Sequence, residues 1–397
     1  MDGSIKAACE KFALLLEEQL ARVDEIKKQE DFIDYSKLGK IVIGVCHGDG
    51  IGPEITKGAS GVLELLLEDE VKAGRVEFRP VEGLTLENRV RKGQSIPDEA
   101  MAQLKSCHAI LKGPTTTPQK GDGRPNLESA NVAMRKALDL FANIRPVRSP
   151  SEGIDWTLFR ENTEGAYAAG SSGFNVTDDL AVDFTITTAQ GSERIARIAY
   201  EYAHKRGYGR VSIVTKANVI KTTDGNFLED CRKIGALYPD ITTDEWYADI
   251  LAAKLIDPKR RRDFKVMILP NLYGDIISDE AAEFQGGVGT AGAANIGKRY
   301  AMFEAIHGSA PRMVEEGRAR YADPCSMLRA ASLLLSHIGY GNKAALLDEA
   351  LDFCMLEDRK LRITGRADGA TCAEYARYVA DNIGVGTARR KDGCAND

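Results

Sequence analysis

The sequence lacks several features that would place it in a specialised class. Its apolar runs are all much shorter than the roughly 20 residues that cross a bilayer, so we expect no membrane-spanning segment. Its eight cysteines include no CxxC pair, and neither a zinc ribbon nor a thioredoxin-like site is indicated. It has no basic excess, and the net charge of −6 argues against a surface that binds nucleic acid. What remains is an acidic chain with 43% hydrophobic residues, an ordinary value for a globular protein.

The N-terminal region also lacks the marks of a targeting segment. It has no apolar core beside a cleavage site, and acidic residues from Glu10 to Glu25 interrupt it. Single, scattered cysteines are typical of a reducing compartment. We therefore expect a cytoplasmic protein, and 397 residues suffice for two or three domains.

Strand and helix patterns alternate along the chain. We expect strands at residues 40–46, 108–112, 210–215, 241–247 and 264–269. Helical patterns begin at Pro53 and span residues 127–141, and the chain from residue 324 onward is mostly helical. This alternation predicts an α/β protein with a largely parallel sheet. Residues 181–188, rich in Thr, Val and Ile, predict an exposed antiparallel strand.

The first thirty residues predict an amphipathic helix. Apolar residues such as Phe12, Leu16, Leu20 and Val23 recur at helical spacing over residues 5–30. Such a helix packs on its own domain or on a neighbouring subunit. We favour the first alternative, because most amphipathic helices bury their apolar face within their own fold.

Two glycine-rich strings have different interpretations. Residues 48–54 follow an expected strand and open a helix, where glycines permit a tight turn and the helix N-terminus favours anions; a structural turn would look the same. Residues 287–292 match GxGxxG but follow a helical stretch and lack an acid-bearing strand about 20 residues on. We interpret the second string as a chance match.

Two carboxylates stand one helical turn apart after the last expected strand. Asp275 and Asp279 at i and i+4 share one helix face, and oxygen ligands of this kind suit Mg²⁺ or Mn²⁺. A solvated acidic face is the alternative. The position just past a strand end favours the metal site, because ligands gather outside the carboxyl ends of parallel strands.

Three arginines suggest a ligand with several carboxylates. Asn131 and Arg135 lie one turn apart on a helix, Arg145 lies on a strand, and Arg160 opens the string RENTEGAY. Guanidinium groups match carboxylates bidentately, so arginines beside a divalent cation would bind a small polycarboxylate. The alternative is a set of unrelated surface arginines.

Tyr167 and Lys221 are the candidate proton-transfer residues. A lysine beside a metal and several arginines can serve as a base near neutrality, although either residue could be an ordinary exposed side chain. His307 follows an apolar strand in a Gly-Ser loop, where a histidine is as often a loop anchor as a ligand.

Together these strings resemble the isocitrate/isopropylmalate dehydrogenase family. GDGIGPEI, LKGPTTTP, FRENTEGAY, NLYGDIISD and FEAIHGSAP occur in the family's order within about residues 40–335. The resemblance implies that family's α/β fold, with two domains, a discontinuous large domain and a mostly parallel central sheet. It places the large domain at 40–140 and 287–397 and the small domain, with a dimer arm, at 141–286. Residues 1–39 form an N-terminal helical extension.

The resemblance also implies a substrate order. Ser129 with Asn131 is similar to the pattern that reads the third carboxylate of isocitrate, whereas isopropylmalate enzymes carry apolar residues there. Polar atoms left unsatisfied against an isopropyl group would cost about 1–3 kcal/mol. Isocitrate is therefore the leading substrate, homoisocitrate the second and 3-isopropylmalate the third.

The family mechanism, carried over by position, gives each residue a role. Asp275 and Asp279, with the partner subunit's Asp249, would bind Mg²⁺ or Mn²⁺. Ser129, Asn131, Arg135, Arg145 and Arg160 would bind the substrate. The partner subunit's Lys221 would assist removal of the hydroxyl proton, and Tyr167 would protonate C3 after loss of CO₂. Because the sites are shared, a homodimer is the expected assembly.

The cofactor is expected along the loops rather than in a Rossmann crevice. The positions that the resemblance assigns to it are Lys112, Thr116, Thr117, Glu304, His307, Gly308, Ser309, Ala310, Arg312 and Asp323. After the HGSAP proline, NAD-using members often carry an acid and NADP-using members a Lys-Tyr pair, whereas this chain has Arg312 and Met313. Asp323 stands where the family usually has an Asn beside the adenine. NAD and NADP both stay open.

One alternative belongs to a different class. Heteromeric members of the family include non-catalytic regulatory subunits, which would be expected to lose a proton-transfer residue or a metal-binding acid. This chain keeps Tyr167, Lys221, Asp249, Asp275 and Asp279, so we favour a catalytic chain.

Overall fold

The fold is described from a computed structural model. The structure describes residues 3–28, 31–118, 121, 123–125, 127–168 and 173–384. The chain forms two compact units, each made of two separate stretches. Unit 1 consists of Met1–Phe32 and Asp139–Phe284, and unit 2 of Ile33–Leu138 and Gln285–Asp397. Residues 385–397, the end of the expected large-domain segment, lie outside the described residues.

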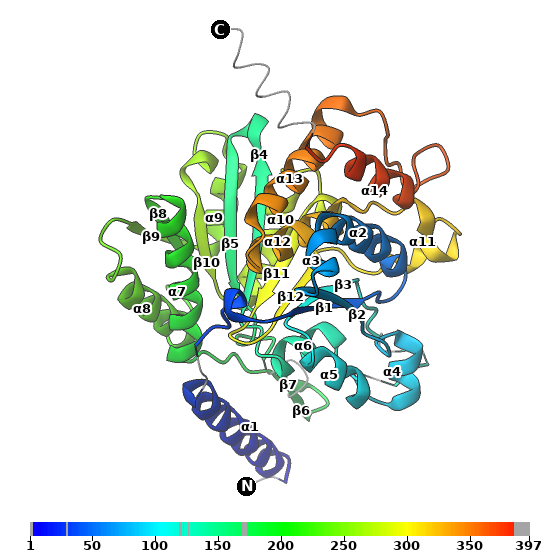
Figure 1. Ribbon diagram of the computed structural model, residues 1–397. Helices are drawn as coiled ribbons and strands as arrows, with labels where there is room; N and C mark the ends of the chain where they lie inside the picture. Colours follow the sequence, from blue (N-terminus) through cyan, green and yellow to red (C-terminus); the bar gives the residue numbers. More distant parts are fainter. Residues whose placement is uncertain are drawn as a thin grey trace. The chain divides into compact units, whose positions relative to one another are not determined.

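Unit 2 contains five strands in the order β2-β1-β3-β12-β11 (Figure 1). All neighbours in this order are parallel except β12 and β11. The strands are β1 Ile41–Cys46, β2 Val76–Pro80, β3 Ala109–Lys112, β11 Gly292–Ile296 and β12 Ala301–Ala305. The helices are α2 Gly52–Leu66, α3 Glu68–Lys72, α4 Leu86–Lys92, α5 Asp98–Lys105, α6 Ala130–Ala137, α11 Pro311–Glu315, α12 Cys325–His337, α13 Gly341–Asp352 and α14 Cys372–Asp381. Short 3-10 turns lie at Tyr35–Lys37, Val288–Thr290 and Ala319–Tyr321, and a π-helical turn at Phe353–Asp358.

Unit 1 also contains a five-stranded part, in the order β4-β5-β10-β8-β9. Only β4 and β5 run antiparallel to each other. The strands are β4 Ala142–Ser149, β5 Ile154–Glu161, β8 Arg210–Thr215, β9 Thr242–Tyr247 and β10 Val266–Leu269, with a separate ribbon of β6 Phe174–Thr177 and β7 Leu180–Val182. The helices are α1 Gly3–Lys28, α7 Ala189–Arg206, α8 Thr223–Gly235, α9 Ala248–Ile256 and α10 Asn271–Glu283. Short 3-10 turns lie at Pro150–Glu152 and Arg261–Asp263. The expected α/β class with mostly parallel strands is confirmed.

Apolar packing explains why β10, a central strand of unit 1, is a continuous apolar run. Every residue of β10 is buried, as expected for a strand covered on both faces. Trp156 is completely buried in the same core, and its ring meets Phe284 edge-on at 5.5 Å. The core fixes the carboxyl end of β10, where α10 begins.

Most expected elements are confirmed, and two differ in length. The helix expected over 127–141 is α6, which ends at Ala137, because Asp139 adopts a φ of +44° and the chain then enters β4. The strand expected over 181–188 is shorter: β7 ends at Val182, and beyond it Ile186 forms only an isolated bridge with Gly165. β7 is antiparallel to β6, as expected.

Gly292, the last residue of the GxGxxG string, has a packing role. A Cβ at this position would lie 2.4 Å from the backbone nitrogen of Ala330 on α12. The glycine therefore lets α12 approach β11 closely, which agrees with the interpretation of the string as a chance match.

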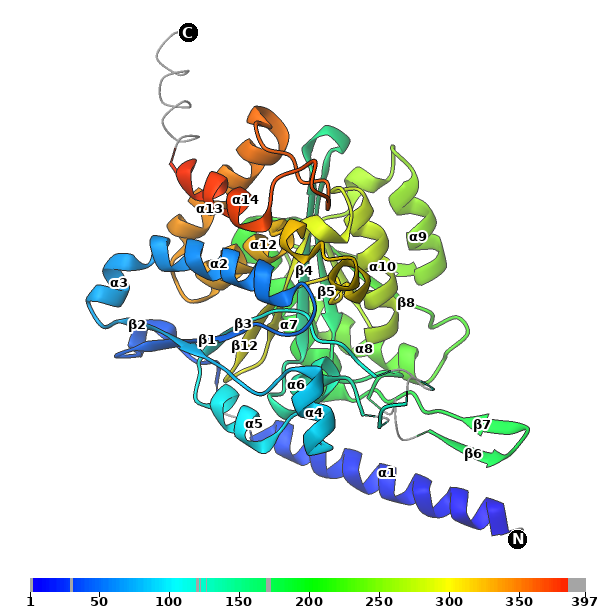
Figure 2. The same ribbon diagram turned by 90° about the vertical axis from the view of Figure 1, so that its right-hand side faces the viewer.

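Helix α1 packs on the unit that contains it, as we expected. It buries Leu15 and Ile26 and lies beside the β6–β7 ribbon (Figure 2), where Phe12 stacks on Phe184 at 5.1 Å. Its neighbouring face leaves Leu16 and Leu20 exposed.

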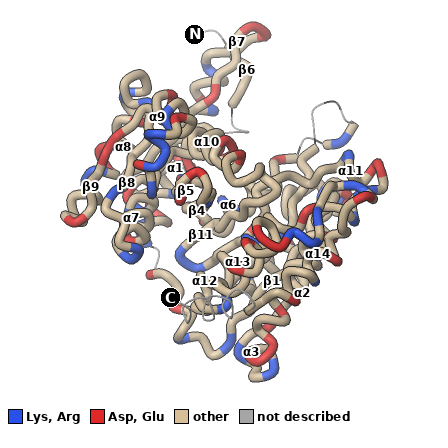
Figure 3. The backbone as a smooth tube through the Cα atoms, turned by 90° about the horizontal axis from the view of Figure 1, so that it is seen from above, with Lys and Arg blue, Asp and Glu red and all other residues tan. Residues whose placement is uncertain are grey.

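The charged residues follow no single-sign pattern. Figure 3 shows basic and acidic residues interspersed in both units. None of the helices in the described part of the chain is long and apolar enough to cross a bilayer.

Candidate active site

A cluster of arginines and aspartates lies where β5 and β10 of unit 1 end. Arg160 pairs in register with Leu269, the last residue of β10, and α10 begins two residues later. Arg145 projects from the adjacent β4, and Asp275 and Asp279 share one face of α10. The expected placement of the two acids on a helix just past a strand end is confirmed.

The arginines bind the two carboxylates directly. Arg145 Nη1 donates to Asp279 Oδ1 at 2.7 Å, and Arg145 Nη2 lies 3.5 Å from Asp275 Oδ1. Arg160 Nη1 donates to Asp275 Oδ1, and the Tyr167 hydroxyl donates to Asp275 Oδ2 at 3.0 Å. Five residues predicted from the sequence therefore meet in one unit.

Burial is unequal across this cluster. The arginine side chains are almost completely buried, at 7% exposed for Arg145 and 1% for Arg160, whereas Asp275 is 34% and Asp279 54% exposed. The guanidinium groups are thus buried in the protein, whereas the carboxylates are accessible to solvent. A ligand would reach the carboxylates first.

Two residues of the NLYGD string hold Arg160 in place, and no sequence pattern beyond adjacency to Asp275 indicates their roles. Asn271 Oδ1 accepts hydrogen bonds from Arg160 Nε at 3.0 Å and Nη2 at 2.7 Å. A Cβ on Gly274 would lie 2.5 Å from Arg160 Cγ, so only glycine leaves room for the side chain. Buried Asn143 and Ser278 similarly accept hydrogen bonds from Arg145.

The other two predicted residues of unit 1 lie elsewhere. Asp249, at the start of α9, accepts a hydrogen bond from Lys216 Nζ at 2.5 Å, and this bond lowers the pKa of Asp249. Lys221 is exposed in the turn between β8 and α8 and forms no hydrogen bond or ion pair with the described residues. Neither residue joins the arginine–aspartate cluster of its own chain.

The donor set can be tested against a divalent cation. Asp275 and Asp279 offer carboxylate oxygens, the ligand type that Mg²⁺ and Mn²⁺ prefer, and both are accessible. No group of three His, Cys, Asp or Glu side chains placed to hold a metal occurs among the residues that the structure describes. One chain therefore fits two of the three expected acidic ligands.

A second set of predicted residues lies at the strand ends of unit 2. Loops after β1, β3 and β12 meet there, because the carboxyl ends of parallel strands share one edge. Asp49 N donates to the Pro114 carbonyl at 2.7 Å, and Ile51 N donates to the Ser309 carbonyl at 3.0 Å. The Thr116 hydroxyl lies 2.6 Å from the Ser309 hydroxyl.

Asp49 organises these loops, a role that the glycine pattern around it did not reveal. Its carboxylate accepts hydrogen bonds from the backbone of Leu86 at 2.7 Å and of Thr116 at 2.8 Å. The buried Arg89 donates to it at 3.2 Å. The acid thus joins three segments far apart in sequence.

The glycines of the first loop permit this close approach. Gly48 has a φ of +74° and Gly50 a φ of +62°, and a Cβ on Gly50 would lie 2.0 Å from the Ser309 carbonyl oxygen. Gly308 faces open space, and Thr117 and Arg312 are exposed. The Arg312 guanidinium pairs with Glu316 at 2.7 Å.

Lys112 and Glu304, both predicted to contact the cofactor, bind each other in the core instead of facing open space. Lys112 is fully buried and donates to Glu304 Oε2 at 3.0 Å, and Arg135 Nη2 donates to Glu304 Oε1 at 3.0 Å. Burial alone would raise the pKa of Glu304, but the two cations outweigh it and hold the pKa at about 2. Arg135 Nε is buried and has no hydrogen-bond partner among the described residues, so it is a donor that an anion could use.

The remaining predicted residues of unit 2 lie at the starts of α6 and α12 and in the loop after β12. Asn131 Oδ1 accepts a hydrogen bond from the Thr115 hydroxyl at 2.9 Å, and Ser129 immediately precedes α6. Asp323 accepts a hydrogen bond from the backbone of Cys325 at 2.8 Å, and burial raises the pKa of Asp323. His307 and Ala310 flank Gly308 and Ser309 in the loop after β12.

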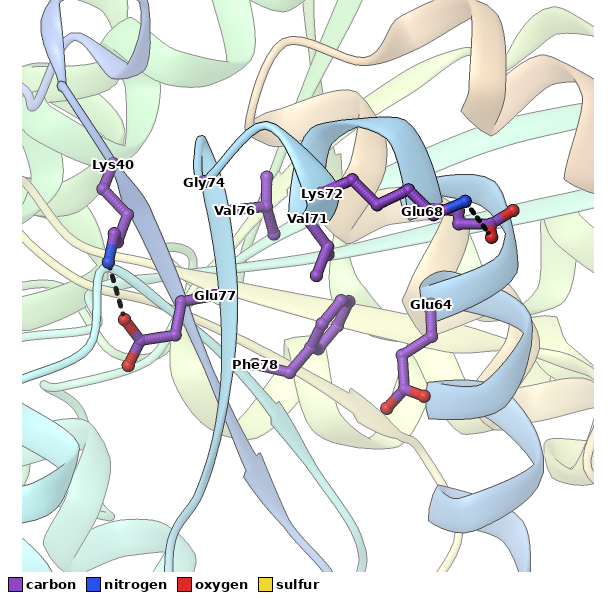
Figure 4. A pocket seen from close by; sticks show the side chains of 9 residues that line it. All are labelled: Lys40, Glu64, Glu68, Val71, Lys72, Gly74, Val76, Glu77 and Phe78. Atoms are coloured by element: carbon purple, nitrogen blue, oxygen red, sulfur yellow. Dashed lines mark hydrogen bonds and ion pairs between the residues drawn. The ribbon is translucent and has the colours of Figure 1, made fainter.

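A cavity of about 580 Å³ lies at the opposite edge of unit 2 (Figure 4). Its lining includes Lys40, which precedes β1, and Val76, which begins β2. Four of its five charged lining residues form ion pairs, Lys40 with Glu77 at 3.1 Å and Lys72 with Glu68 at 2.5 Å. The cavity therefore lies at the amino ends of the strands and contains none of the predicted residues.

Comparison with known proteins gives concordant results. A family model described as isocitrate/isopropylmalate dehydrogenase matches residues 42–378. The chain is 38% identical over 315 residues to an isocitrate dehydrogenase (NADP) of Rickettsia prowazekii (strain Madrid E), a match that covers 78% of this chain. It spans only 62% of that relative's length.

Two further similarities cover nearly all of the compared protein. The chain is 34% identical over 331 residues to a homoisocitrate dehydrogenase of Methanocaldococcus jannaschii, covering 79% of this chain and 90% of that one. A crystal structure of isocitrate dehydrogenase from Methylococcus capsulatus matches with a TM-score of 0.75 and 33% identity, covering 86% of this chain and 99% of that one.

Proposed function

Because the chain belongs to the isocitrate/isopropylmalate dehydrogenase family, we propose that it catalyses the oxidative decarboxylation of isocitrate to 2-oxoglutarate, a reaction of the tricarboxylic acid cycle. The reaction would require Mg²⁺ or Mn²⁺ and transfer a hydride to NAD⁺ or NADP⁺. The observation that carries the proposal is the cluster of unit 1, in which two buried arginines meet two accessible aspartates and the Tyr167 hydroxyl.

The arginines support a polycarboxylate substrate. Arg145 and Arg160 are held by Asn143, Ser278 and Asn271, so their positions are fixed before a ligand binds. Arg135 has a buried Nε donor that no described residue accepts. Fixed guanidinium groups neutralise carboxylates without a further loss of side-chain entropy.

The polar pair at the start of α6 supports isocitrate over 3-isopropylmalate. Asn131 is already hydrogen-bonded to Thr115, and Ser129 stands at the start of the same helix. An isopropyl group brought against them would leave polar atoms unsatisfied, at about 1–3 kcal/mol. Homoisocitrate keeps the third carboxylate and is the second candidate.

Asp275 and Asp279, with the partner subunit's Asp249, would hold the divalent cation. A cation bound there supplies Lewis-acid polarisation of the substrate oxygens. Tyr167, oriented by its hydrogen bond to Asp275, would deliver a proton to C3. The partner subunit's Lys221 would take the hydroxyl proton as the hydride leaves C2.

The loops of unit 2 would hold the nicotinamide cofactor, which accepts the hydride. Thr116 and Ser309 bind each other there, and Thr117, Gly308 and Arg312 are accessible. An accessible guanidinium can bind a 2′-phosphate, but Glu316 already occupies it, so we keep NAD and NADP as alternatives.

Two copies of the chain would form the functional unit. Asp249 and Lys221 stand apart from the cluster of their own chain, which supports a homodimer with shared sites. A non-catalytic regulatory subunit is the alternative from a different class, but all five proposed proton-transfer and metal-binding residues are present. We place the protein in the cytoplasm, since six of its cysteines are buried and free.

The test is a matrix of three substrates and two cofactors, with and without Mn²⁺, followed by identification of the product. We expect Mn²⁺-dependent reduction of NAD⁺ or NADP⁺ with isocitrate and formation of 2-oxoglutarate. Turnover of only homoisocitrate or 3-isopropylmalate would overturn the substrate assignment. No turnover with any pair would favour the regulatory subunit.

A further inference from the structure

Two buried acids lie between the predicted substrate arginine and the predicted proton donor of unit 1. Glu161 and Glu164 are only 2% and 3% exposed, and both belong to the segment that joins Arg160 to Tyr167. Burial, and then the charge of Glu164, raise the pKa of Glu161 to about 7. A pair of this kind carries negative charge into the interior, where it needs a cation.

Helix α1 supplies one such cation, to Glu164. Arg22 Nη1 donates to Glu164 Oε1 at 2.9 Å, and Arg22 Nη2 donates to the Thr163 hydroxyl at 2.9 Å. The Arg22 side chain is 23% exposed, so the contact is largely shielded from water. The contact bridges about 140 residues of sequence, and α1 lies outside the family match, which begins at residue 42.

Glu164 is connected to the catalytic cluster by an unbroken series of hydrogen bonds. Its carbonyl accepts from Asn271 Nδ2 at 2.9 Å, and Asn271 Oδ1 accepts from Arg160. Arg160 binds Asp275, which also accepts from the Tyr167 hydroxyl. The series begins at Arg22 and ends at the predicted metal-binding acid.

Thr188 also binds the Glu164 carboxylate, and among the described residues Arg22 alone forms an ion pair with it. The backbone and hydroxyl of Thr188 donate to its carboxylate at 2.8 and 2.5 Å. Arg194 offsets part of the rise in the pKa of Glu161, but it donates to Asp139 and to the Thr163 hydroxyl rather than to Glu164. Loss of Arg22 would therefore leave a buried carboxylate without its ion pair, and the turn that carries it would have to move.

We propose that Arg22 is a positioning residue, through which the N-terminal helix fixes the Arg160–Tyr167 segment of the active site. The inference rests on the proposed function for the roles of Arg160 and Tyr167. The N-terminal helix would then position active-site residues as well as pack on its own unit.

The experiment compares three full-length variants. Arg22→Ala removes the ion pair, Arg22→Lys keeps the charge, and Lys28→Ala is the matched control, because Lys28 pairs with Glu25 of the same helix. The measurements are kcat and KM for isocitrate well below the melting temperature, and hydrogen–deuterium exchange of the segment 158–168. We expect Arg22→Ala to lower kcat/KM about tenfold and to speed exchange in that segment. Arg22→Lys should recover most of both, and Lys28→Ala should match the parent protein.

Each outcome has a defined meaning. A lower melting temperature for Arg22→Ala with kcat/KM and exchange equal to the control would overturn the inference, since Arg22 would then only attach the helix. If Arg22→Ala does not fold, Arg22→Met, which keeps the apolar length of the side chain, takes its place with the same expected loss. If the parent protein turns over no substrate, the proposed function fails, while exchange at 158–168 still decides the role of Arg22.

Discussion

At the scale of single residues, the site is built on charges that are satisfied before any ligand arrives. Arg160 is 1% exposed, yet Asn271 and Asp275 occupy its donors. A buried guanidinium is tolerated only when it is paired in this way. The same principle explains why the accessible members of the cluster are the acids.

Tyr167 is predicted to act as the proton donor. Tyr167→Phe removes only the hydroxyl, so we expect kcat with isocitrate to fall by about 10²–10⁴-fold while KM changes little. Steady-state kinetics checks this, with Tyr208→Phe as the control, since its hydroxyl donates to Asp155 outside the cluster. Unchanged kcat in Tyr167→Phe would remove Tyr167 from the mechanism.

Glu161 gives the fold a predicted pH dependence. Its pKa is raised from 4.5 to about 7. Between pH 4.5 and about 7, the folded protein therefore keeps a proton that the unfolded chain has lost. Stability from this group is present below pH 4.5 and declines as pH rises through about 7. Between pH 5 and pH 8, the melting temperature should therefore fall more in the parent protein than in Glu161→Gln. The exposed Glu17→Gln serves as the control; an equal fall in all three proteins would contradict the prediction.

At the scale of elements, close backbone contacts position the loops of unit 2. Gly50 has a positive φ and faces the Ser309 carbonyl, whereas Gly61 lies within α2 with open space around it. Both constraints at Gly50 exclude a Cβ, and neither applies at Gly61.

The two glycines therefore predict opposite effects of one substitution. Gly50→Ala should lower the free energy of unfolding by about 2–3 kcal/mol, because strain and overlap add. Gly61→Ala should raise it by about 0.5–1 kcal/mol, because alanine restricts the unfolded chain and favours the helix. Urea denaturation measures both, and equal effects would show that the contact with Ser309 relaxes freely.

Local patterns were enough to predict much of the fold and part of the site. The spacing of Asp275 and Asp279 after an apolar strand predicted a shared helix face, which the structure has. Long-range partners could not be predicted in this way. The Lys112–Glu304 pair joins residues 192 positions apart, and Arg22 reaches Glu164 across 142, so no local period reveals them. The end of α6 was missed because the left-handed conformation of Asp139 is set by the chain's entry into β4.

At the scale of the whole molecule, one chain brings together only two of the three acids that we propose as metal ligands. Asp249 is bound to Lys216, and the described residues contain no three-acid group. Our proposal of a homodimer with shared sites makes this a quantitative prediction about mixed assemblies.

Asp249→Asn and Asp275→Asn should each be inactive alone but active when mixed. In a mixed dimer, one site would combine an intact Asp275 with the partner's intact Asp249. The other site would lack both of these acids. Random subunit exchange then leaves about one site in four intact, so activity should approach a quarter of the parent value. Mixing without subunit exchange is the control. Failure to recover activity after exchange would place Asp249 outside the metal site of the partner.

The buried triad of Lys112, Arg135 and Glu304 has an evolutionary consequence. Removing one partner from a buried ion pair costs about 3–5 kcal/mol, a large part of the stability of a typical domain. A change at one of these positions is therefore tolerated only after a change at another. Among descendants of a common ancestor, the three positions should covary, and a lineage with a neutral residue at 304 should also have lost a cation at 112 or 135.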